Sequence, residues 1–260
     1  MNIAIIGYGK MGKMIEKAAI DGKHNIVTIV DPVVLESSAF PGTRVYKRIE
    51  EAKNIDDADA AIEFTQPATA VANIKALAER KIPTVVGTTG WHDHLDEVKQ
   101  AVEKAGSSLI WSSNFSMGVN LFYRIAWYAS KLVDAFPEFD VGGFEAHHNK
   151  KLDSPSGTAK TLAEGVLDRI ERKKKVVWET LNRKPAPDEL HFPSLRIGSA
   201  PGRHSLIFDS PADIIEITHN ARNRESFASG AIRAAQWLTT GGKRQGVFTI
   251  DEMLKDLLGI

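Results

Sequence analysis

The sequence contains no cysteine among its 260 residues. Disulfide bonds, thiolate catalysis and cysteine-ligated metal centres are therefore excluded, and nothing supports an oxidising compartment. An excess of charge of one sign is also missing, because 33 Lys and Arg residues balance 33 Asp and Glu residues. Without a net charge the protein has no global field to recruit nucleic acid or a membrane surface, so we expect neither as a partner.

Long hydrophobic runs are absent as well. No uninterrupted apolar stretch reaches about 18 residues, the length that predicts a membrane-spanning helix. The chain begins with a short apolar strand and lacks the basic and hydrophobic regions of a secretory signal. We therefore expect a cytoplasmic protein of one large or two small domains.

The N-terminus carries a glycine-rich motif in the context of a nucleotide-binding fold. The apolar run Asn2–Ile6 predicts a buried strand, Gly7-Tyr-Gly-Lys-Met-Gly12 follows it, and apolar residues at helical spacing begin at Met14. A second apolar run, Ile26–Val30, ends in Asp31. A lone G-x-G-x-x-G motif is weak evidence, but a strand, a helix and a following acid are the context that dinucleotide binding requires. The predicted cofactor residues here are Gly7, Tyr8, Gly9, Lys10, Met11, Gly12 and Asp31.

Asp31 bears on the choice of dinucleotide. A carboxylate at the end of the second strand accepts hydrogen bonds from the adenosine ribose and repels a 2′-phosphate. The next residues, Pro32 and Val33, supply no guanidinium, so the sequence favours NADH. Lys10 and Lys13 argue in the other direction, because either could reach a phosphate, and use of NADPH stays open.

Alternating strands and helices continue through the first half of the chain, a pattern typical of an open parallel sheet. Strands are predicted over residues 59–64, 84–86 and 108–111, and helices over 70–80 and 94–105. Ligands of such sheets bind where the strands end, so we expect the following turns to surround the nicotinamide. These turn residues are Gly87, Thr88, Thr89, Ser112, Ser113, Asn114 and Phe115.

The pattern changes after Gly118. A long helix is predicted over residues 120–135 and a strand over 139–145. Two alternating runs, 204–208 and 213–219, predict antiparallel strands with one buried face. A helix over residues 227–238 is the last element predicted.

These patterns predict an α/β protein, with a Rossmann-type parallel-sheet domain and a smaller α+β domain for substrate binding and oligomerisation. The dinucleotide-binding domain would comprise residues 1–116 and 226–260, and residues 117–225 would form the substrate-binding and tetramerisation domain. The strands around Leu206 and Ile215 have apolar faces that need a partner surface.

The segment Glu145-Ala-His-His-Asn-Lys-Lys-Leu-Asp-Ser-Pro-Ser-Gly-Thr158 is the most informative stretch of the chain. Apolar residues over 159–170 recur on one helical face, so a helix follows the motif. Ser154 or Ser156 can cap this helix, and Pro155 suits its first turn.

The start of this helix has the features of a carboxylate site. Free backbone N–H groups at Gly157 and Thr158 would face outward at the positive end of the helix dipole. His147 and Lys151 would then act as proton donors beside a bound acidic substrate, which is typical of an enzyme. Taken singly, each of these residues is more often structural, and the prediction depends on their combination. His92-x-His94 could suggest a metal pair, but no third ligand is nearby and we expect no metal.

Together these motifs resemble the 4-hydroxy-tetrahydrodipicolinate reductases of the diaminopimelate–lysine pathway. The resemblance rests on the glycine motif Gly7–Gly12 and the histidine motif Glu145–Thr158, with support from Gly87–Gly90, Asn114–Asn120 and Ile217–Ala231. It covers nearly the whole chain. It implies that NADH or NADPH reduces a cyclic imine with two carboxylates, in a two-domain homotetramer whose substrate-domain sheets form the oligomer.

The resemblance also implies residue roles. His147 corresponds to the proton donor and acceptor of the family, and Lys151 to its second proton donor; which of them protonates carbon stays open. The implied substrate contacts are His148, Ser156, Gly157, Thr158 and Arg196.

The chain departs from the family pattern at three positions. Many members have an arginine where Lys10 stands and another where Pro32 stands, so NADPH preference is in doubt. Arg203 replaces a commoner glutamate.

Two other functions stay open. Another two-domain NAD(P)-dependent reductase of a small carboxylated substrate would fit the glycine motif, and only the histidine motif argues against it. A non-catalytic dinucleotide-sensing module would not need proton donors beside an anion site.

Overall fold

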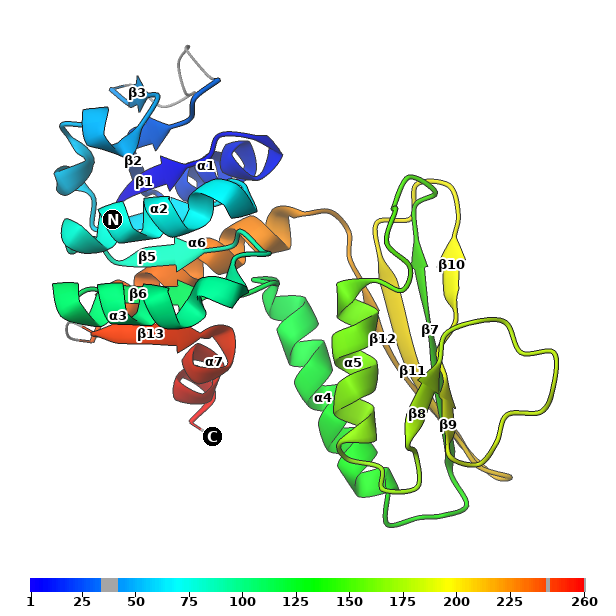
Figure 1. The fold of residues 1–260 in the computed structure, drawn as a ribbon. Coiled ribbons are helices and arrows are strands. Elements are labelled where there is room, and N and C mark those ends of the chain that lie inside the picture. Colours follow the sequence, from blue (N-terminus) through cyan, green and yellow to red (C-terminus); the bar gives the residue numbers. More distant parts are fainter. Residues whose placement is uncertain (34–41, 242–243, 260) are drawn as a thin grey trace. The chain divides into compact units, whose positions relative to one another are not determined.

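The computed structural model describes residues 1–33, 42–241 and 244–259. The chain divides into two compact units, which Figure 1 shows in sequence colours. The first unit is formed by Met1–Ser116 with Glu225–Ile260, and the second by Met117–Arg224. The second boundary therefore falls one residue earlier than the sequence-based boundary at residues 225 and 226.

A parallel sheet of seven strands forms the centre of the first unit. Its strands are β1 (Asn2–Ile6), β2 (Asn25–Val30), β3 (Arg44–Tyr46), β4 (Ala60–Glu63), β5 (Thr84–Val86), β6 (Ser108–Trp111) and β13 (Gly246–Thr249). They lie in the order β13-β6-β5-β4-β1-β2-β3, so the chain reverses direction across the sheet between β1 and β4. The apolar β1 is buried because it has neighbours on both edges and helices on both faces. The predicted Rossmann-type sheet is confirmed.

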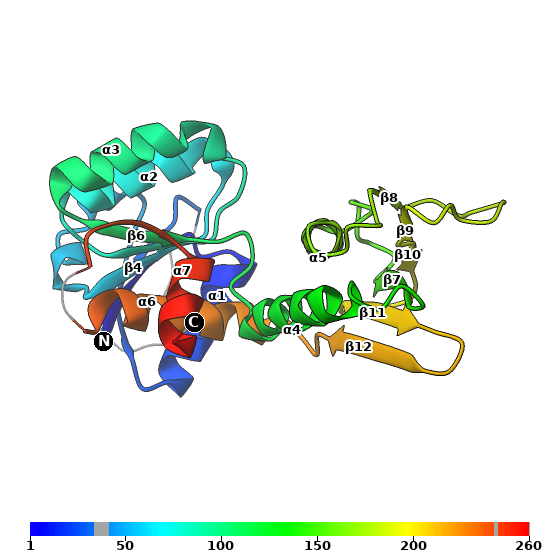
Figure 2. The same ribbon diagram turned by 90° about the horizontal axis from the view of Figure 1, so that it is seen from below.

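Helices cover both faces of this sheet. They are α1 (Lys10–Asp21), α2 (Pro67–Glu79), α3 (Leu95–Ala105), α6 (Glu225–Thr239) and α7 (Ile250–Leu258), with short 3-10 turns at Ile49–Glu51, Ile55–Asp57 and His92–His94. Figure 2 shows α2 and α3 on one face, with α1 and α6 on the other.

The C-terminal elements β13 and α7 are missing from the sequence-based prediction, which ends at the helix now seen as α6. The sequence did contain a signal for the start of α7, the Thr249-x-x-Glu252 pattern of a capping box. In the structure the Thr249 side chain accepts from the backbone of Glu252, and the Glu252 side chain accepts from the backbone of Thr249. The four-residue strand β13 is too short for a periodic pattern, and its place in the sheet depends on pairing with β6 and on packing such as that of Phe248 against Trp237.

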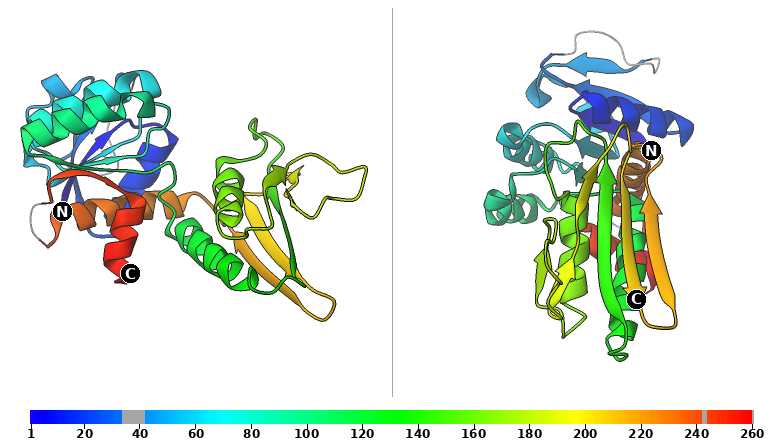
Figure 3. Two further views of the ribbon diagram at one scale, coloured as in Figure 1. Left: turned by 60° about the horizontal axis from the view of Figure 1, so that its bottom comes forward. Right: turned by 90° about the vertical axis from the view of Figure 1, so that its right-hand side faces the viewer.

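The second unit combines two sheets with two helices. Its strands are β7 (Asp140–His147), β8 (Lys175–Val177), β9 (Glu189–His191), β10 (Ser194–Arg196), β11 (Arg203–Asp209) and β12 (Ile214–Asn220). Four of them form a mixed sheet in the order β10-β7-β11-β12, and β8 pairs with β9. The helices α4 (Met117–Val133) and α5 (Gly157–Leu167) lie on one face of the mixed sheet (Figure 3).

The apolar surface that remains open on this sheet differs from the predicted one. Leu206 is 0% exposed because α4 and α5 already cover its face, so it needs no partner surface. On the opposite face lie Phe144 and Ile207, both partly exposed, and Ile214, which is 71% exposed. The prediction for Leu206 was wrong because the alternating pattern does not say which face the helices cover.

Among the described residues, no helix combines the length and the apolar character needed to cross a membrane.

Candidate active site

The loop after β1 has a backbone geometry that only glycine permits. Gly7 has a φ of +90°, and a Cβ there would lie 2.2 Å from the carbonyl oxygen of Phe64. A Cβ at Gly12 would lie 2.2 Å from the Gly7 carbonyl oxygen, so α1 packs directly on the loop. Gly9 has no atom within 4 Å of its Cβ position, so the loop is open on that side. This is the arrangement in which a glycine loop lets a pyrophosphate approach.

The N-terminus of α1 and the carboxylate of Asp31 both lie at this loop. Gly9 is the N-cap and has no side chain to accept from the first turn, which suits the binding of an anion. Asp31 accepts hydrogen bonds from the backbone N–H groups of Tyr8 at 2.7 Å and Val33 at 2.9 Å. These bonds hold the Asp31 carboxylate at the end of β2, the position from which an acid binds a ribose.

Tyr8 directs its side chain into the protein. Its ring is buried and its hydroxyl donates to Glu16 of α1, while Lys13 Nζ lies 5.9 Å from the ring centroid. Burial and the hydrogen bond to Glu16 raise the pKa of Tyr8. Only the backbone of Tyr8 is therefore available at the loop surface. Lys10, in contrast, is exposed.

The turns after β5 and β6 lie at the same edge of the sheet. A Cβ at Gly87 would lie 2.0 Å from the ring of Phe64, and Phe115 packs against that ring with centroids 6.3 Å apart. Thr88 Oγ1 accepts from the Thr65 backbone at 2.7 Å. Ser112 Oγ accepts from the Asn114 backbone at 3.0 Å. The exposed members of the predicted set are Thr89 and Ser113.

A buried carboxyl group lies beside these turns. Glu63, the last residue of β4, is 0% exposed and accepts hydrogen bonds from Thr65 Oγ1 and from Asn73 Nδ2. Burial raises the pKa of Glu63, although its hydrogen bonds oppose that effect. Glu63 is not among the predicted site residues, but a charged residue inside an otherwise apolar strand was a signal for it.

In the second unit, polar side chains gather around Glu145, which is 0% exposed. The register of the sheet places Glu145 of β7 beside Ser194 of β10 and His204 of β11. His147, on the same face of β7, pairs with Arg196 of β10. Strand pairing therefore brings together residues that are far apart in the sequence. Ser194, Glu145 and His204 lie side by side across three strands, and Arg196 lies beside His147.

Both oxygens of the Glu145 carboxylate face donors. Oε2 lies 3.2 Å from His147 Nδ1 and 3.4 Å from His204 Nε2. Burial alone would raise the pKa of Glu145, but the nearby imidazoles of His147 and His204 and the hydrogen bonds from Ser156 and Ser194 outweigh it and hold this pKa well below its usual range. The donors to Oε1 are Ser156 N at 3.0 Å, Ser194 Oγ at 2.7 Å and Arg196 Nη2 at 2.9 Å.

Glu145 and His204 do not appear among the predicted site residues. Glu145 opens the histidine motif, and strand alternation puts it on the same face as His147, so the sequence held a signal for it. His204 lies on another strand, and only the register of β7 and β11 brings it to Glu145.

The segment after β7 carries the other predicted polar groups. Lys151 Nζ forms an ion pair with Asp153 at 2.8 Å, and this contact lowers the pKa of Asp153. The Lys151 side chain is 23% exposed. His148 Nδ1 is buried and has no hydrogen-bond partner among the described residues.

The N-terminus of α5 is capped by Ser156, whose Oγ accepts from Ala159 N at 3.1 Å. The cap leaves the N–H groups of Gly157 and Thr158 available, and Gly157 has no atom within 4 Å of its Cβ position. The anion site expected at this helix start is therefore open. Pro155 precedes the N-cap and so lies outside the first turn, contrary to the prediction, because the helix begins at Gly157.

Arg196 links two parts of the site. Its Nη2 donates to Glu145 Oε1 at 2.9 Å and to the carbonyl of Asp153 at 2.7 Å. The guanidinium thus connects the loop that carries Lys151 to the buried Glu145 carboxylate.

Glu145, His147 and His204 also have ligand atoms within 4.8 Å of one another, close enough for a metal ion. The guanidinium of Arg196 binds the same carboxylate, and its positive charge opposes a cation at this position. We therefore interpret these side chains as a hydrogen-bonded network.

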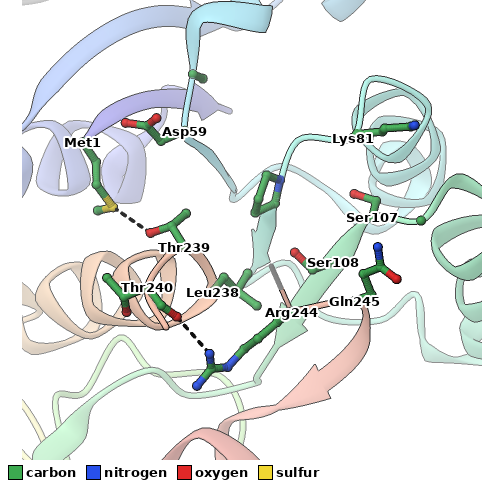
Figure 4. A pocket seen from close by; sticks show the side chains of 13 residues that line it. Met1, Asp59, Lys81, Ser107, Ser108, Leu238, Thr239, Thr240, Arg244 and Gln245 are labelled. Atoms are coloured by element: carbon green, nitrogen blue, oxygen red, sulfur yellow. Dashed lines mark hydrogen bonds between the residues drawn. The ribbon is translucent and has the colours of Figure 1, made fainter. Parts of the chain in front are cut away.

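A separate cavity of about 660 Å³ opens at the amino-terminal edge of the seven-stranded sheet (Figure 4). It is lined by Met1, Asp59, Ser107 and Arg244, whose guanidinium donates to the Thr240 carbonyl. This edge is opposite to the one that carries the glycine loop, so the cavity is distinct from the candidate site.

The fold and the polar cluster define the class of protein. A Rossmann-type unit with an open glycine loop, and a second unit with imidazoles and an ammonium near a helix N-terminus, characterise an NAD(P)H-dependent oxidoreductase. Comparison with known families identifies the particular kind of oxidoreductase. The family model "Dihydrodipicolinate reductase, N-terminus" matches residues 1–115, and the family model "Dihydrodipicolinate reductase, C-terminus" matches residues 118–254. The chain belongs to the dihydrodipicolinate reductase family, and the resemblance found in its sequence is confirmed.

Relatives of known name match nearly the whole length of this chain. The 4-hydroxy-tetrahydrodipicolinate reductase of Christiangramia forsetii is 35% identical, over 99% of this chain and 99% of that protein. The enzyme of the same name from Archaeoglobus fulgidus is 34% identical, over 98% and 100%.

Solved structures share the fold. Dipicolinate-bound dihydrodipicolinate reductase from Paenisporosarcina sp. TG-14 has a TM-score of 0.78 at 22% identity, covering 96% of this chain and 97% of that one. An amine dehydrogenase from Mycobacterium smegmatis has a TM-score of 0.60 at 10% identity, covering 96% and 95%. The architecture alone is therefore common to dehydrogenases with other names.

Proposed function

We propose that this protein reduces 4-hydroxy-tetrahydrodipicolinate to tetrahydrodipicolinate with NADH or NADPH, in the pathway to diaminopimelate and lysine. The observation that carries the proposal is the open N-terminus of α5 beside the histidine and lysine side chains. The N–H groups of Gly157 and Thr158, which have no partner in the described part of the chain, suit a substrate carboxylate. His147, His148 and Lys151 come from the segment that leads into this helix.

The proposed roles follow from these positions. The substrate loses its 4-hydroxyl group together with a neighbouring ring hydrogen as water, which leaves a conjugated ring. The bound dinucleotide would supply a hydride to one end of that conjugated system, and the other end must then take up a proton. His147 holds and transfers that proton, and Lys151 stabilises the developing negative charge. Gly157, Thr158 and His148 bind and orient the dicarboxylate.

The proposed cofactor site lies at the carboxyl edge of the parallel sheet. The glycine loop and the N-terminus of α1 bind the pyrophosphate, and Asp31 binds the ribose. The turns Gly87–Thr89 and Ser112–Phe115 contact the nicotinamide half. We propose NADH as the preferred donor, because a carboxylate at position 31 repels a 2′-phosphate and Pro32 supplies no guanidinium.

We further propose a cytoplasmic homotetramer. The face of the mixed sheet that α4 and α5 leave uncovered carries Phe144, Ile207 and the 71% exposed Ile214. A second copy of the same face would bury these apolar side chains.

A coupled assay tests the activity. The cyclic substrate is generated in situ, and oxidation of NADH and NADPH is followed by absorbance. We expect turnover that depends on the cyclic substrate and competitive inhibition by dipicolinate, the ligand bound in the Paenisporosarcina relative. Binding of the dinucleotide without turnover would favour a sensing module. Turnover only with other carboxylated substrates would favour a different reductase of the same fold.

A further inference from the structure

The contacts of Glu145 suggest a task beyond packing. The carboxylate is fully buried, yet its hydrogen bonds keep it ionised. Three donors already occupy Oε1, whereas the donors that face Oε2 among the described residues are the imidazoles of His147 and His204. Oε2 makes no well-aligned hydrogen bond, although His147 Nδ1 lies 3.2 Å away, so a small rotation of the ring would complete one. Catalytic hydrogen bonds commonly tighten in this way when substrate binds.

The pairing of the Glu145 carboxylate with His147 determines which nitrogen of the His147 ring carries the proton. An ionised carboxylate can only accept, so the nitrogen that faces it, Nδ1 of His147, must carry a hydrogen. The other nitrogen, Nε2, is then free to exchange a proton. Gly202 lies beside this nitrogen, and its lack of a side chain leaves room there, because a Cβ at Gly202 would lie 3.1 Å from His147 Nε2.

We propose that Glu145 is a positioning residue of this active site, and that its carboxylate holds the His147 proton on Nδ1 so that Nε2 faces the substrate. The proposal rests on the proposed function for the identity of the substrate. The arrangement is the one in which a buried carboxylate orients a catalytic histidine in unrelated enzymes, where the carboxylate is not itself protonated. His204 shares Oε2 as a second donor, and burial lowers its pKa, which favours a neutral ring there.

Nuclear magnetic resonance tests the tautomer directly on the wild-type protein. The His147 ring is assigned by comparison with His147→Gln, in protein labelled with ¹⁵N-histidine, at a pH where the ring is neutral. We expect the proton on Nδ1. In Glu145→Gln the amide can donate toward Nδ1, so the proton should move wholly or partly to Nε2. A wild-type His147 with its proton on Nε2 would overturn the proposal, whether or not the variant folds.

Kinetics give the second arm of the test. Glu145→Gln should lower kcat by about 10²- to 10⁴-fold, as expected for a wrong tautomer, with KM for the cyclic substrate and affinity for NADH within about threefold of wild type. Ser194→Ala is the matched control, because it removes a bond to Oε1 and leaves the pair at Oε2 intact. It should lose less than about tenfold in kcat.

Three further outcomes would contradict the proposal. Wild-type kcat in a folded Glu145→Gln variant would leave Glu145 a structural residue. Equal losses in Glu145→Gln and Ser194→Ala would assign the effect to general disruption of the network. Binding of equimolar Zn²⁺ that shifts the signals of both His147 and His204 would identify a metal site instead. If the wild-type protein does not turn over the cyclic substrate, the proposed function fails, while the tautomer experiment still decides the role of Glu145.

Discussion

His147 and Lys151 lie close together in sequence but have different partners. His147 faces a carboxylate that is 0% exposed, so the charge that orients it is shielded from solvent. Lys151 pairs with Asp153, whose side chain is 59% exposed, and water weakens such a pair. A bound dicarboxylate would compete for Lys151 more readily than for His147. The difference suits a fixed proton donor beside a mobile charge-stabilising group.

Replacement of these two residues should affect chemistry and leave cofactor binding intact. We expect His147→Gln and Lys151→Ala each to reduce turnover by about 10²- to 10⁴-fold, the usual contribution of a positioned acid. Affinity for NADH should not change, because both residues belong to the second unit and not to the glycine loop. Steady-state kinetics and a fluorescence titration check both statements. Wild-type turnover in His147→Gln would make His148 the next candidate for the acid.

The residues at position 31 and 32 predict the cofactor preference. Tyr8 N and Val33 N hold the Asp31 carboxylate in place, so a 2′-phosphate cannot displace it without breaking these bonds. We expect NADH to bind at least as tightly as NADPH in a fluorescence-quenching titration. A dissociation constant tenfold lower for NADPH would contradict this and would point to Lys10 or Lys13 as the phosphate ligand.

The first turn of helix α5 carries a stabilising cap and, in the proposed function, the substrate-binding N–H groups. Ser156 caps the helix by accepting from Ala159 N, and the N–H groups of Gly157 and Thr158 have no partner among the described residues. The hydroxyl of Ser156 is 3.2 Å from His204 Nε2, so the cap also connects the helix to the Glu145 network. One turn of helix is thus tied to the sheet at the point where the substrate is expected.

Two variants of this turn should separate its functions. Ser156→Ala removes the acceptor for Ala159 N and should lower the free energy of unfolding by about 1 kcal/mol. Thr158→Val keeps the backbone N–H and removes only the hydroxyl, so it should mainly weaken substrate binding, by roughly 1–2 kcal/mol. Urea denaturation and KM measurements distinguish these effects. Loss of turnover in Thr158→Val at saturating substrate would show that the hydroxyl takes part in the chemistry.

The strand β7 and its neighbours link the stability of the sheet to pH through Glu145. The pKa of Glu145 is held below its usual value in the folded protein. Its contribution to stability is therefore present above the unfolded-state pKa of about 4.3 and is lost as the pH falls below that value. In Glu145→Gln, the urea midpoint should fall less steeply than in the wild type as the pH is lowered from about 5 to 3. Parallel midpoint curves for the two proteins would contradict this assignment.

At the scale of the whole molecule, the sheet of the second unit has one covered and one open face. Helices α4 and α5 bury the side that carries Leu206 and Phe208. The other side presents Phe144, Ile207 and Ile214 in company with the ion pair of Arg203 and Glu216, at 3.2 Å. The guanidinium of Arg203 also lies over the ring of Phe144, 5.3 Å from its centroid, so Arg203 packs on this face.

The open face predicts the state of association. We expect light scattering to give a tetramer of the 28.5 kDa chain at micromolar concentration. Ile214→Asp, which places a charge on the open face, should shift the equilibrium toward smaller species, while Asp251→Asn on the exposed surface of α7 should not. A stable wild-type monomer would contradict the proposed tetramer.

Many of the local elements and both motifs could be predicted from the sequence, although β13 and α7 were not placed in this way. Gly7, Gly9 and Gly12 stand at a fixed spacing between a strand and a helix, so spacing along the chain was sufficient to find them. The packing reason is local only at Gly12, where a Cβ would meet the Gly7 carbonyl, whereas a Cβ at Gly7 would meet Phe64 of a distant segment. The cap of α5 is equally local, since Ser156 accepts from a residue in the same turn. The similarity of these motifs to known reductases was likewise readable, because it depends on residue order alone.

The surroundings of His147 and the face left open on the sheet follow from the tertiary structure alone. Ser194 and Arg196 reach Glu145 from 49 and 51 residues further along the chain, and His204 reaches it through the pairing of β7 with β11. The register of such pairs depends on which face is buried under α4 and α5, and a local pattern of alternating residues is the same for either choice. The buried carboxylate, its imidazole partners and the exposed Ile214 therefore follow from packing between distant segments, which no short stretch of sequence contains.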